Sequence, residues 1–170
     1  MKNMDRLSAQ GKLLAAAAIA FLALSTASPA KADSVRWRTI VGIVQAGNVV
    51  GNITGGGQPW TTLGGRARVD LGASRVNFDV QGLVLAGGNT IGTPGAVVQV
   101  KGTLVCDPGG ANVTLDTALV PLSPEGDADF SGPIGPIPST CNRSNVVFLI
   151  RIAADRWIAN GAVRTSSGNN

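Results

Sequence analysis

The sequence contains no histidine and no tyrosine, and only two of its residues are cysteine. Without histidine, neither a Ser-His-Asp or Cys-His nucleophile arrangement nor the usual histidine-containing catalytic zinc site can be built. The glycine clusters stand between predicted strands rather than at the start of helices, which excludes the context of a phosphate-binding loop. The sequence therefore predicts no metal and no cofactor, and it points away from the common enzyme classes.

The first 32 residues have the layout of a secretory signal peptide. Basic residues precede an uncharged apolar run at 13–24, and Ala30-Lys31-Ala32 fits the A-x-A cleavage pattern. A helix of twelve residues rises only about 18 Å, which is too short for a bilayer core of about 30 Å. We therefore predict a signal peptide over 1–32 and a single β domain over 33–170. That domain is expected to be exported, periplasmic or extracellular, and to carry no transmembrane anchor.

The charge of the predicted mature segment is nearly balanced. Residues 33–170 hold ten arginines and lysines against nine aspartates and glutamates, and Lys101 is the only lysine among them. The high pI of the whole chain therefore gives no reason to expect nucleic acid or an anionic membrane as partner. The closest approach to a charge run is Arg36-Trp37-Arg38, which places two charges on one face of a predicted strand.

Cys106 and Cys141 are predicted to form one disulfide bond, because an even number of cysteines in an exported chain usually pairs. Two buried free thiols and half of a metal site are the alternatives. A bridge closing a loop of this length would contribute about 4 kcal/mol on the chain-entropy model.

Apolar and polar residues alternate with period two along most of the chain, which is typical of strands. The clearest case is a hairpin whose strands 66–71 and 74–80 flank Gly72-Ala73, a two-residue turn predicted to be type II′. In this register Arg66 faces Asp79 on the polar side, while the other side is apolar. A slip by one residue would place charges in the core.

Two further strands and the overall spacing of turns define the expected fold. Residues 35–44 are expected to place one set of side chains on a common face: Val35, Trp37, Thr39, Val41 and Ile43. Residues 146–152 are apolar on both faces until Arg151, which predicts a central strand covered from two sides. We expect an all-β protein of about 8–10 short strands, either an antiparallel β-sandwich (jelly-roll or Ig-like) or a small closed barrel.

Few residues are candidates for chemistry. Glu125, Asp127 and Asp129 alternate along one predicted strand face, where they would bind calcium, act as an acid/base pair, or simply face solvent. Trp60 follows a proline beside a glycine run and is the tryptophan most expected to be exposed for stacking on a sugar. Asp107 and Asp116 are isolated and carry no signal. The candidate ligand-binding residues are therefore Trp60, Asp127 and Asp129, with no catalytic residue assigned.

The segments TLGGRARVDL, GLVLAGGN, VKGTLVCD and WIANGAVR resemble those of a family of small exported bacterial all-β proteins with no assigned activity. The resemblance implies a single extracytoplasmic β domain and assigns no functional residue. We expect a non-enzymatic binding or structural module of the cell envelope or extracellular space, with a glycan or an envelope protein as partner. The alternative is a carboxylate-dependent, glycan-active enzyme.

Overall fold

The computed structural model describes residues 33–167, so the predicted signal peptide lies outside the described residues. Within this range the chain forms strands and no helix, which confirms the predicted all-β class. The longer strands are β1 (Ser34–Gly42), β5 (Gly64–Asp70), β6 (Arg75–Gln81), β8 (Gln99–Cys106), β9 (Val113–Asp116), β11 (Ala128–Pro133), β12 (Val146–Ile152) and β13 (Trp157–Ser167). Five segments span two residues each: β2 (Val49–Val50), β3 (Ile53–Thr54), β4 (Trp60–Thr61), β7 (Val84–Leu85) and β10 (Val120–Pro121). No helix in the described range is long and apolar enough to cross a membrane.

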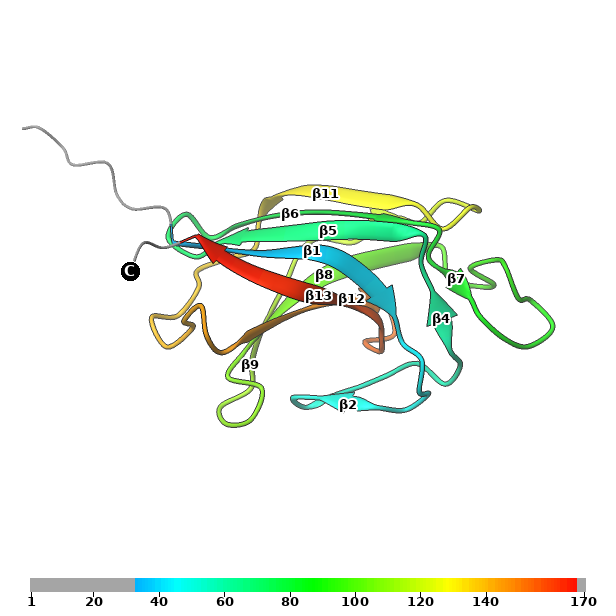
Figure 1. The fold of residues 1–170 in the computed structure, drawn as a ribbon, viewed down its shortest axis with the longest axis horizontal. Coiled ribbons are helices and arrows are strands. Elements are labelled where there is room, and N and C mark those ends of the chain that lie inside the picture. Colours follow the sequence, from blue (N-terminus) through cyan, green and yellow to red (C-terminus); the bar gives the residue numbers. More distant parts are fainter. Residues whose placement is uncertain (1–32, 168–170) are drawn as a thin grey trace, which may run out of the picture. The chain divides into compact units, whose positions relative to one another are not determined.

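Nine of these strands form one antiparallel sheet that curls into a half-barrel (Figure 1). The strand order is β10-β8-β12-β13-β1-β5-β6-β11, and β9 pairs with β8. The two end strands of this path, β10 and β11, are not hydrogen-bonded partners among the described residues. The antiparallel sheet is thus as predicted, whereas neither a sandwich nor a closed barrel is confirmed.

The predicted hairpin is confirmed in its strands and register. β5 pairs with β6 so that Arg66 lies opposite Asp79 and Val69 lies opposite Val76. The turn differs from the prediction, because its left-handed residue is Ser74 (φ 50°) and Gly72 has no positive φ. Four residues connect the strands, and the backbone N–H of Ala73 donates to Oδ1 of Asp70 (2.9 Å). A type II′ turn at Gly72-Ala73 was therefore the wrong prediction.

The predicted apolar face of the first strand is correct at its two ends, where Val35, Trp37 and Ile43 are buried, but not in its middle. Val35 and Trp37 are buried, but the next buried residue is Ile40, while Val41 is 39% exposed. β1 pairs with β5 only as far as Trp37 and then follows β13 alone to Gly42. The strand bends where it leaves β5 (Figure 1), so the side that faces the core changes there.

Aromatic rings link the strands on the inner side of the curled sheet. Ring centroids lie 5.6 Å apart between Trp37 and Phe148, and 5.7 Å apart between Phe148 and Phe78. Phe130 continues the series at 6.0 Å from Phe78. Gly102 of β8 lies against two of these rings, since a Cβ there would stand 2.8 Å from Phe148 and 2.9 Å from Phe78. The curl thus brings β8 close to β6, and only glycine fits at that contact.

The central strand β12 is buried on both faces, as predicted. Its inner face carries Phe148 and Ile150, and its other face carries Leu149, all fully buried. The segment with β2 and β3 lies against the neighbouring strand β8, since a Cβ on Gly51 would stand 3.2 Å from the Val105 side chain. The indole Nε1 of Trp157 holds this segment by donating to the backbone oxygen of Asn48 (3.0 Å).

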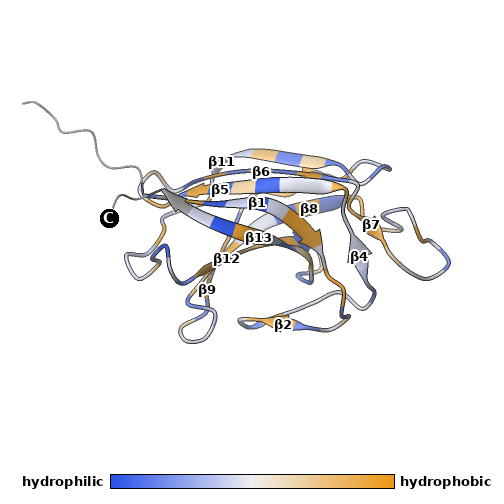
Figure 2. Cartoon of the chain, in the orientation of Figure 1, coloured by the Kyte–Doolittle hydropathy of each residue, from blue (hydrophilic) through white to orange (hydrophobic). Residues whose placement is uncertain are grey.

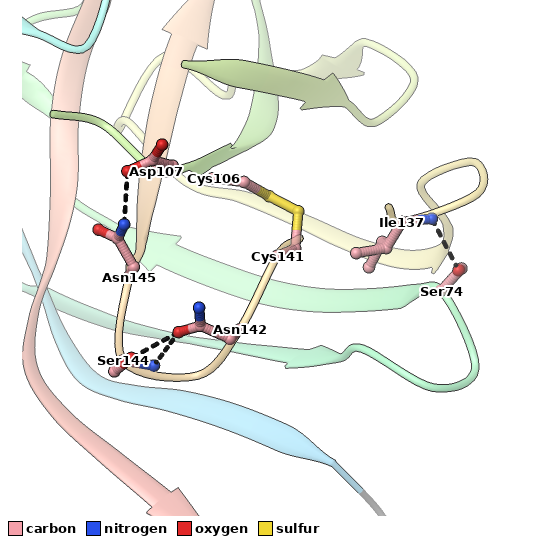
Figure 3. The surroundings of a disulfide bond; sticks show 8 residues. All are labelled: Ser74, Cys106, Asp107, Ile137, Cys141, Asn142, Ser144 and Asn145. Atoms are coloured by element: carbon pink, nitrogen blue, oxygen red, sulfur yellow. Dashed lines mark hydrogen bonds between the residues drawn. A yellow bond between two sulfur atoms is a disulfide. The ribbon is translucent and has the colours of Figure 1, made fainter. Parts of the chain in front are cut away.

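The predicted disulfide between Cys106 and Cys141 is present, with Cα atoms 5.1 Å apart. It connects the end of β8 to the loop before β12 (Figure 3). Nδ2 of Asn145 donates to Oδ1 of Asp107 beside the bridge (2.6 Å). The disulfide is compatible with an oxidising, exported location.

Candidate functional site

The outer face of β1, β5 and β6 carries four arginines: Arg36, Arg38, Arg66 and Arg68. They line an open groove of about 730 Å³ together with Asn77 and Asp79 of β6 and Thr165 of β13. Period-two alternation creates this arrangement, because the residues between the arginines, such as Trp37 and Ala67, face the core. Figure 2 shows hydrophilic and hydrophobic residues alternating along the strands.

The strand register places like charges directly opposite each other. Arg36 of β1 is the cross-strand partner of Arg68 of β5. Arg38 and Arg66 are the next outward residues along the same strands and line the same groove. Opposed like charges destabilise a sheet by some tenths of a kcal/mol. The Arg36–Arg68 pair therefore lowers the stability of the folded protein. Local features that lower stability are typical of functional sites.

Among the residues that the structure describes, only one of the four arginines has a carboxylate partner. Nε of Arg66 lies 2.8 Å from Oδ1 of Asp79 in an exposed ion pair. Within residues 33–167, no carboxylate lies within salt-bridge distance of Arg36, Arg38 or Arg68. The groove therefore holds three uncompensated guanidinium groups, each with planar N–H donors suited to carboxylate, sulfate or phosphate oxygens.

A second hollow of about 440 Å³ adjoins this groove and is acidic. It is lined by Asp127 and Asp129, the two predicted carboxylates, together with Asp79. Asp129 of β11 lies opposite Asp79 of β6 in the register. Oδ1 of Asp127 accepts a hydrogen bond from the backbone N–H of Gly82 (2.9 Å), which anchors that side chain to the adjacent turn. The structure thus brings the two predicted aspartates together on one outward face.

The acidic hollow shares one of its aspartates with the arginine groove. No group of three or more histidine, cysteine, aspartate or glutamate side chains in the described range is arranged to hold a metal ion. One of the three aspartates, Asp79, is already paired with Arg66. The hollow shares Asp79 with the arginine groove, so the two form neighbouring regions of opposite charge on one surface.

The expectation that Trp60 is exposed is wrong, because Trp60 is only 6% exposed. It lies on β4, where it pairs with Leu85 of β7. Its backbone N–H donates to the carbonyl oxygen of Ile43 (2.8 Å), which ties β4 to the end of β1. The proline and glycines around it indicate a loop, but the Trp60 side chain belongs to the hydrophobic core. Trp60 offers no exposed ring on which a sugar could stack.

A compensated charge cluster lies on β8, β9, β12 and the turn after β12, and it includes Asp116, for which the sequence predicts no role. Its members are Lys101, Thr103, Asp116, Arg151 and Asp155. Nζ of Lys101 lies 2.8 Å from Asp116 and 2.7 Å from Asp155. Arg151 reaches both carboxylates at 3.0 Å, and the Thr103 hydroxyl donates to Asp116 at 2.6 Å.

Within this cluster the ion pairs set the protonation states. Burial alone would raise the pKa of Asp116, but hydrogen bonds from Lys101 and Thr103 and the charge of Arg151 hold it below its ordinary value. The hydrogen bond and charge of Lys101, helped by Arg151, lower the pKa of Asp155. Burial opposes the charged form of Lys101, but its two aspartate partners raise its pKa. Each charge is matched, so the cluster is a structural one.

Comparisons with protein-family models, with curated proteins and with solved structures found no match to this chain. The sequence did contain the signal of the groove, since the R-x-R pattern occurs twice, at Arg36–Arg38 and Arg66–Arg68. The pattern alone does not show that the two strands that carry it, β1 and β5, are neighbours in the sheet.

Proposed function

We propose that the protein is an exported, non-enzymatic binding module that takes an anionic ligand in the four-arginine groove. The observation that carries this proposal is the direct opposition of Arg36 and Arg68 within a groove of about 730 Å³. A cleft lined by charge of one sign attracts ligands of the opposite sign and concentrates them locally. Export is supported by the signal-peptide pattern at 1–32 and by the disulfide, which is compatible with an oxidising compartment.

The chemistry of the groove favours binding over catalysis. Arginine remains charged at every physiological pH, so it donates hydrogen bonds but transfers no proton. The groove's one carboxylate, Asp79, is engaged by Arg66. Its other polar groups are the amide of Asn77 and the hydroxyl of Thr165. The arginine guanidinium groups hold and orient an anion, and such charge-assisted hydrogen bonds contribute about 1.5–3 kcal/mol each.

The test measures binding of dextran sulfate to the purified protein by titration calorimetry, with uncharged dextran as the control polymer. The double variant Arg36→Gln/Arg68→Gln should bind dextran sulfate about 100-fold more weakly, because it loses two charge-assisted contacts. The matched variant Arg143→Gln/Arg156→Gln removes the same charge outside the groove lining and should change affinity less than threefold. An equal loss in both variants would contradict a localised site, as would failure of the wild type to bind.

A carboxylate-dependent, glycan-active enzyme is the second candidate, favoured by one observation. Asp127 and Asp129 line the same hollow, as a pair of catalytic carboxylates would. Release of reducing ends from polysaccharides by the wild type, but not by Asp127→Asn or Asp129→Asn, would support this reading. No release by the wild type from acidic or neutral polysaccharides would leave the binding module as the better proposal.

A further inference from the structure

One polar row runs across five strands on the outer face of the sheet. Its members are cross-strand neighbours in register: Thr165 of β13, Arg36 of β1, Arg68 of β5, Asn77 of β6 and Ser131 of β11. Adjacent strands are about 4.8 Å apart, so this row spans about 19 Å perpendicular to the strands. Four of the five residues line the groove, and the fifth, Ser131, extends the row beyond it.

The order of chemical groups along the row is specific. The two guanidinium groups stand side by side, and hydroxyl or amide groups flank them on both sides. The Ser131 hydroxyl donates to Oδ1 of Asn77, which leaves the Asn77 amide N–H₂ directed to other acceptors. A ligand that matches this row has negative charges at its middle and hydroxyl groups toward its ends.

The row lacks contacts that two other kinds of polyanion would use. The aromatic residues next to it, Trp37 and Phe78, are each only 3% exposed and belong to the core. Proteins that bind single-stranded nucleic acid combine a positively charged groove with exposed aromatic rings on which the bases stack, and this groove has no such ring among the described residues. The flanking hydroxyl and amide groups would also be unused by a compact inorganic anion.

The spacing of the row favours a linear polymer. Each strand contributes one polar group about 4.8 Å from the next, which is close to the rise of one sugar unit in an extended polysaccharide. We infer that the groove binds an acidic polysaccharide lying across the strands, with charged groups of neighbouring sugars at Arg36 and Arg68. Hydroxyl groups of the flanking sugars contact Thr165 and Asn77. This inference rests on the proposed anion-binding function and specifies its ligand class.

A second pair of arginines gives the ligand its preferred position. Arg38 and Arg66 are displaced from Arg36 and Arg68 by two residues along their strands, or about 7 Å. Asp79 partly neutralises this second pair through Arg66, whereas the first pair has no carboxylate partner in the described range. The first pair therefore attracts the polymer's charges more strongly, and this places the chain along the row of Asn77 and Thr165.

The experiment titrates the purified protein with galacturonate oligomers of two, four and six units. Methyl-esterified hexamer serves as the uncharged control, and tripolyphosphate serves as the compact polyanion. Affinity should rise from dimer to hexamer as more of the row is filled, and esterification should abolish it. Asn77→Ala should weaken hexamer binding about fivefold and leave tripolyphosphate binding unchanged. Gln81→Ala removes an exposed amide from the same strand outside the groove and should change neither.

The possible failures are distinguishable. If tripolyphosphate binds as tightly as the hexamer, or if Asn77→Ala weakens both equally, the site binds anions but the polysaccharide inference is wrong. The same holds if the methyl-esterified hexamer binds as well as the acidic one. If neither the oligomers nor tripolyphosphate bind, the proposed function fails together with the inference. Urea melts of both variants establish that each remains folded, as expected for exposed side chains.

Discussion

Two charged regions of this protein differ in whether their charges are paired. The cluster at Lys101 matches two cations with two carboxylates through ion pairs of 2.7–3.0 Å. The groove on β1, β5 and β6 sets four arginines together and supplies one carboxylate. Charges that serve the fold are paired, because an unpaired charge near the core is costly. Charges left unpaired on the surface do not stabilise the fold, and this difference supports the proposal that the groove is the binding region.

The largest expected effect lies directly beneath the groove, on β6. Phe78→Ala should lower the free energy of unfolding by about 3–5 kcal/mol, because it removes a buried ring and leaves a cavity. Phe78 contacts the rings of Phe130 and Phe148 and the backbone at Gly102. Asp79→Ala, on the outward side of the same strand, should cost at most about 1 kcal/mol. Denaturant melts compare the two directly, and a larger cost for Asp79→Ala would show that the groove face is structural.

Apart from the disulfide, the features predicted from sequence are the local ones. The β5–β6 hairpin was predictable because its charges and apolar residues alternate in step, so that only one register satisfies both faces. The disulfide followed from the cysteine count. The bend of β1 was not predictable, because it occurs where β1 leaves β5, a partner set by the sheet as a whole.

The candidate site was predicted only in part, for the same reason. Asp127 and Asp129 were recognised because they alternate along one strand. The arginine groove needed the knowledge that β1 and β5 are neighbours, although more than twenty residues separate them in sequence. The cluster around Asp116 draws on β8, β9, β12 and the turn that carries Asp155. Contacts of this kind depend on the fold and leave no periodic pattern in any single segment.

The paired cluster should make stability depend on acid. Because the pKa of Asp116 and Asp155 is lowered in the folded state, the unfolded chain binds more protons as the pH falls toward their ordinary range. Their contribution is therefore present above that range and is lost as the pH falls through and below it. For the half-exposed Asp116 we expect a loss of about 1 kcal/mol. Urea melts from pH 6 to pH 2 measure the change.

The variant Asp116→Asn supplies the control for this pH dependence. It keeps the shape of the side chain but removes the titrating group, so its stability should fall less steeply between pH 5 and pH 2 than that of the wild type. Parallel curves for the two proteins would mean that Asp116 does not contribute through its charge, and the description of the cluster as a compensated structural network would be wrong.

The smallest expected effect is also the most direct comparison of paired with unpaired charge. Arg68→Gln should raise the free energy of unfolding by up to about 0.5 kcal/mol, because it relieves the repulsion with Arg36 across the strands. Arg66→Gln, on the same face of the same strand, should lower it by a similar amount, because it breaks the ion pair with Asp79. Both effects are electrostatic and exposed, so both should shrink in 1 M salt, where the screening length is about 3 Å. Urea melts at low and high salt measure the two signs. If Arg68→Gln destabilises the protein by more than about 1 kcal/mol, Arg68 is a structural residue and the groove loses its central evidence of stability given up for binding.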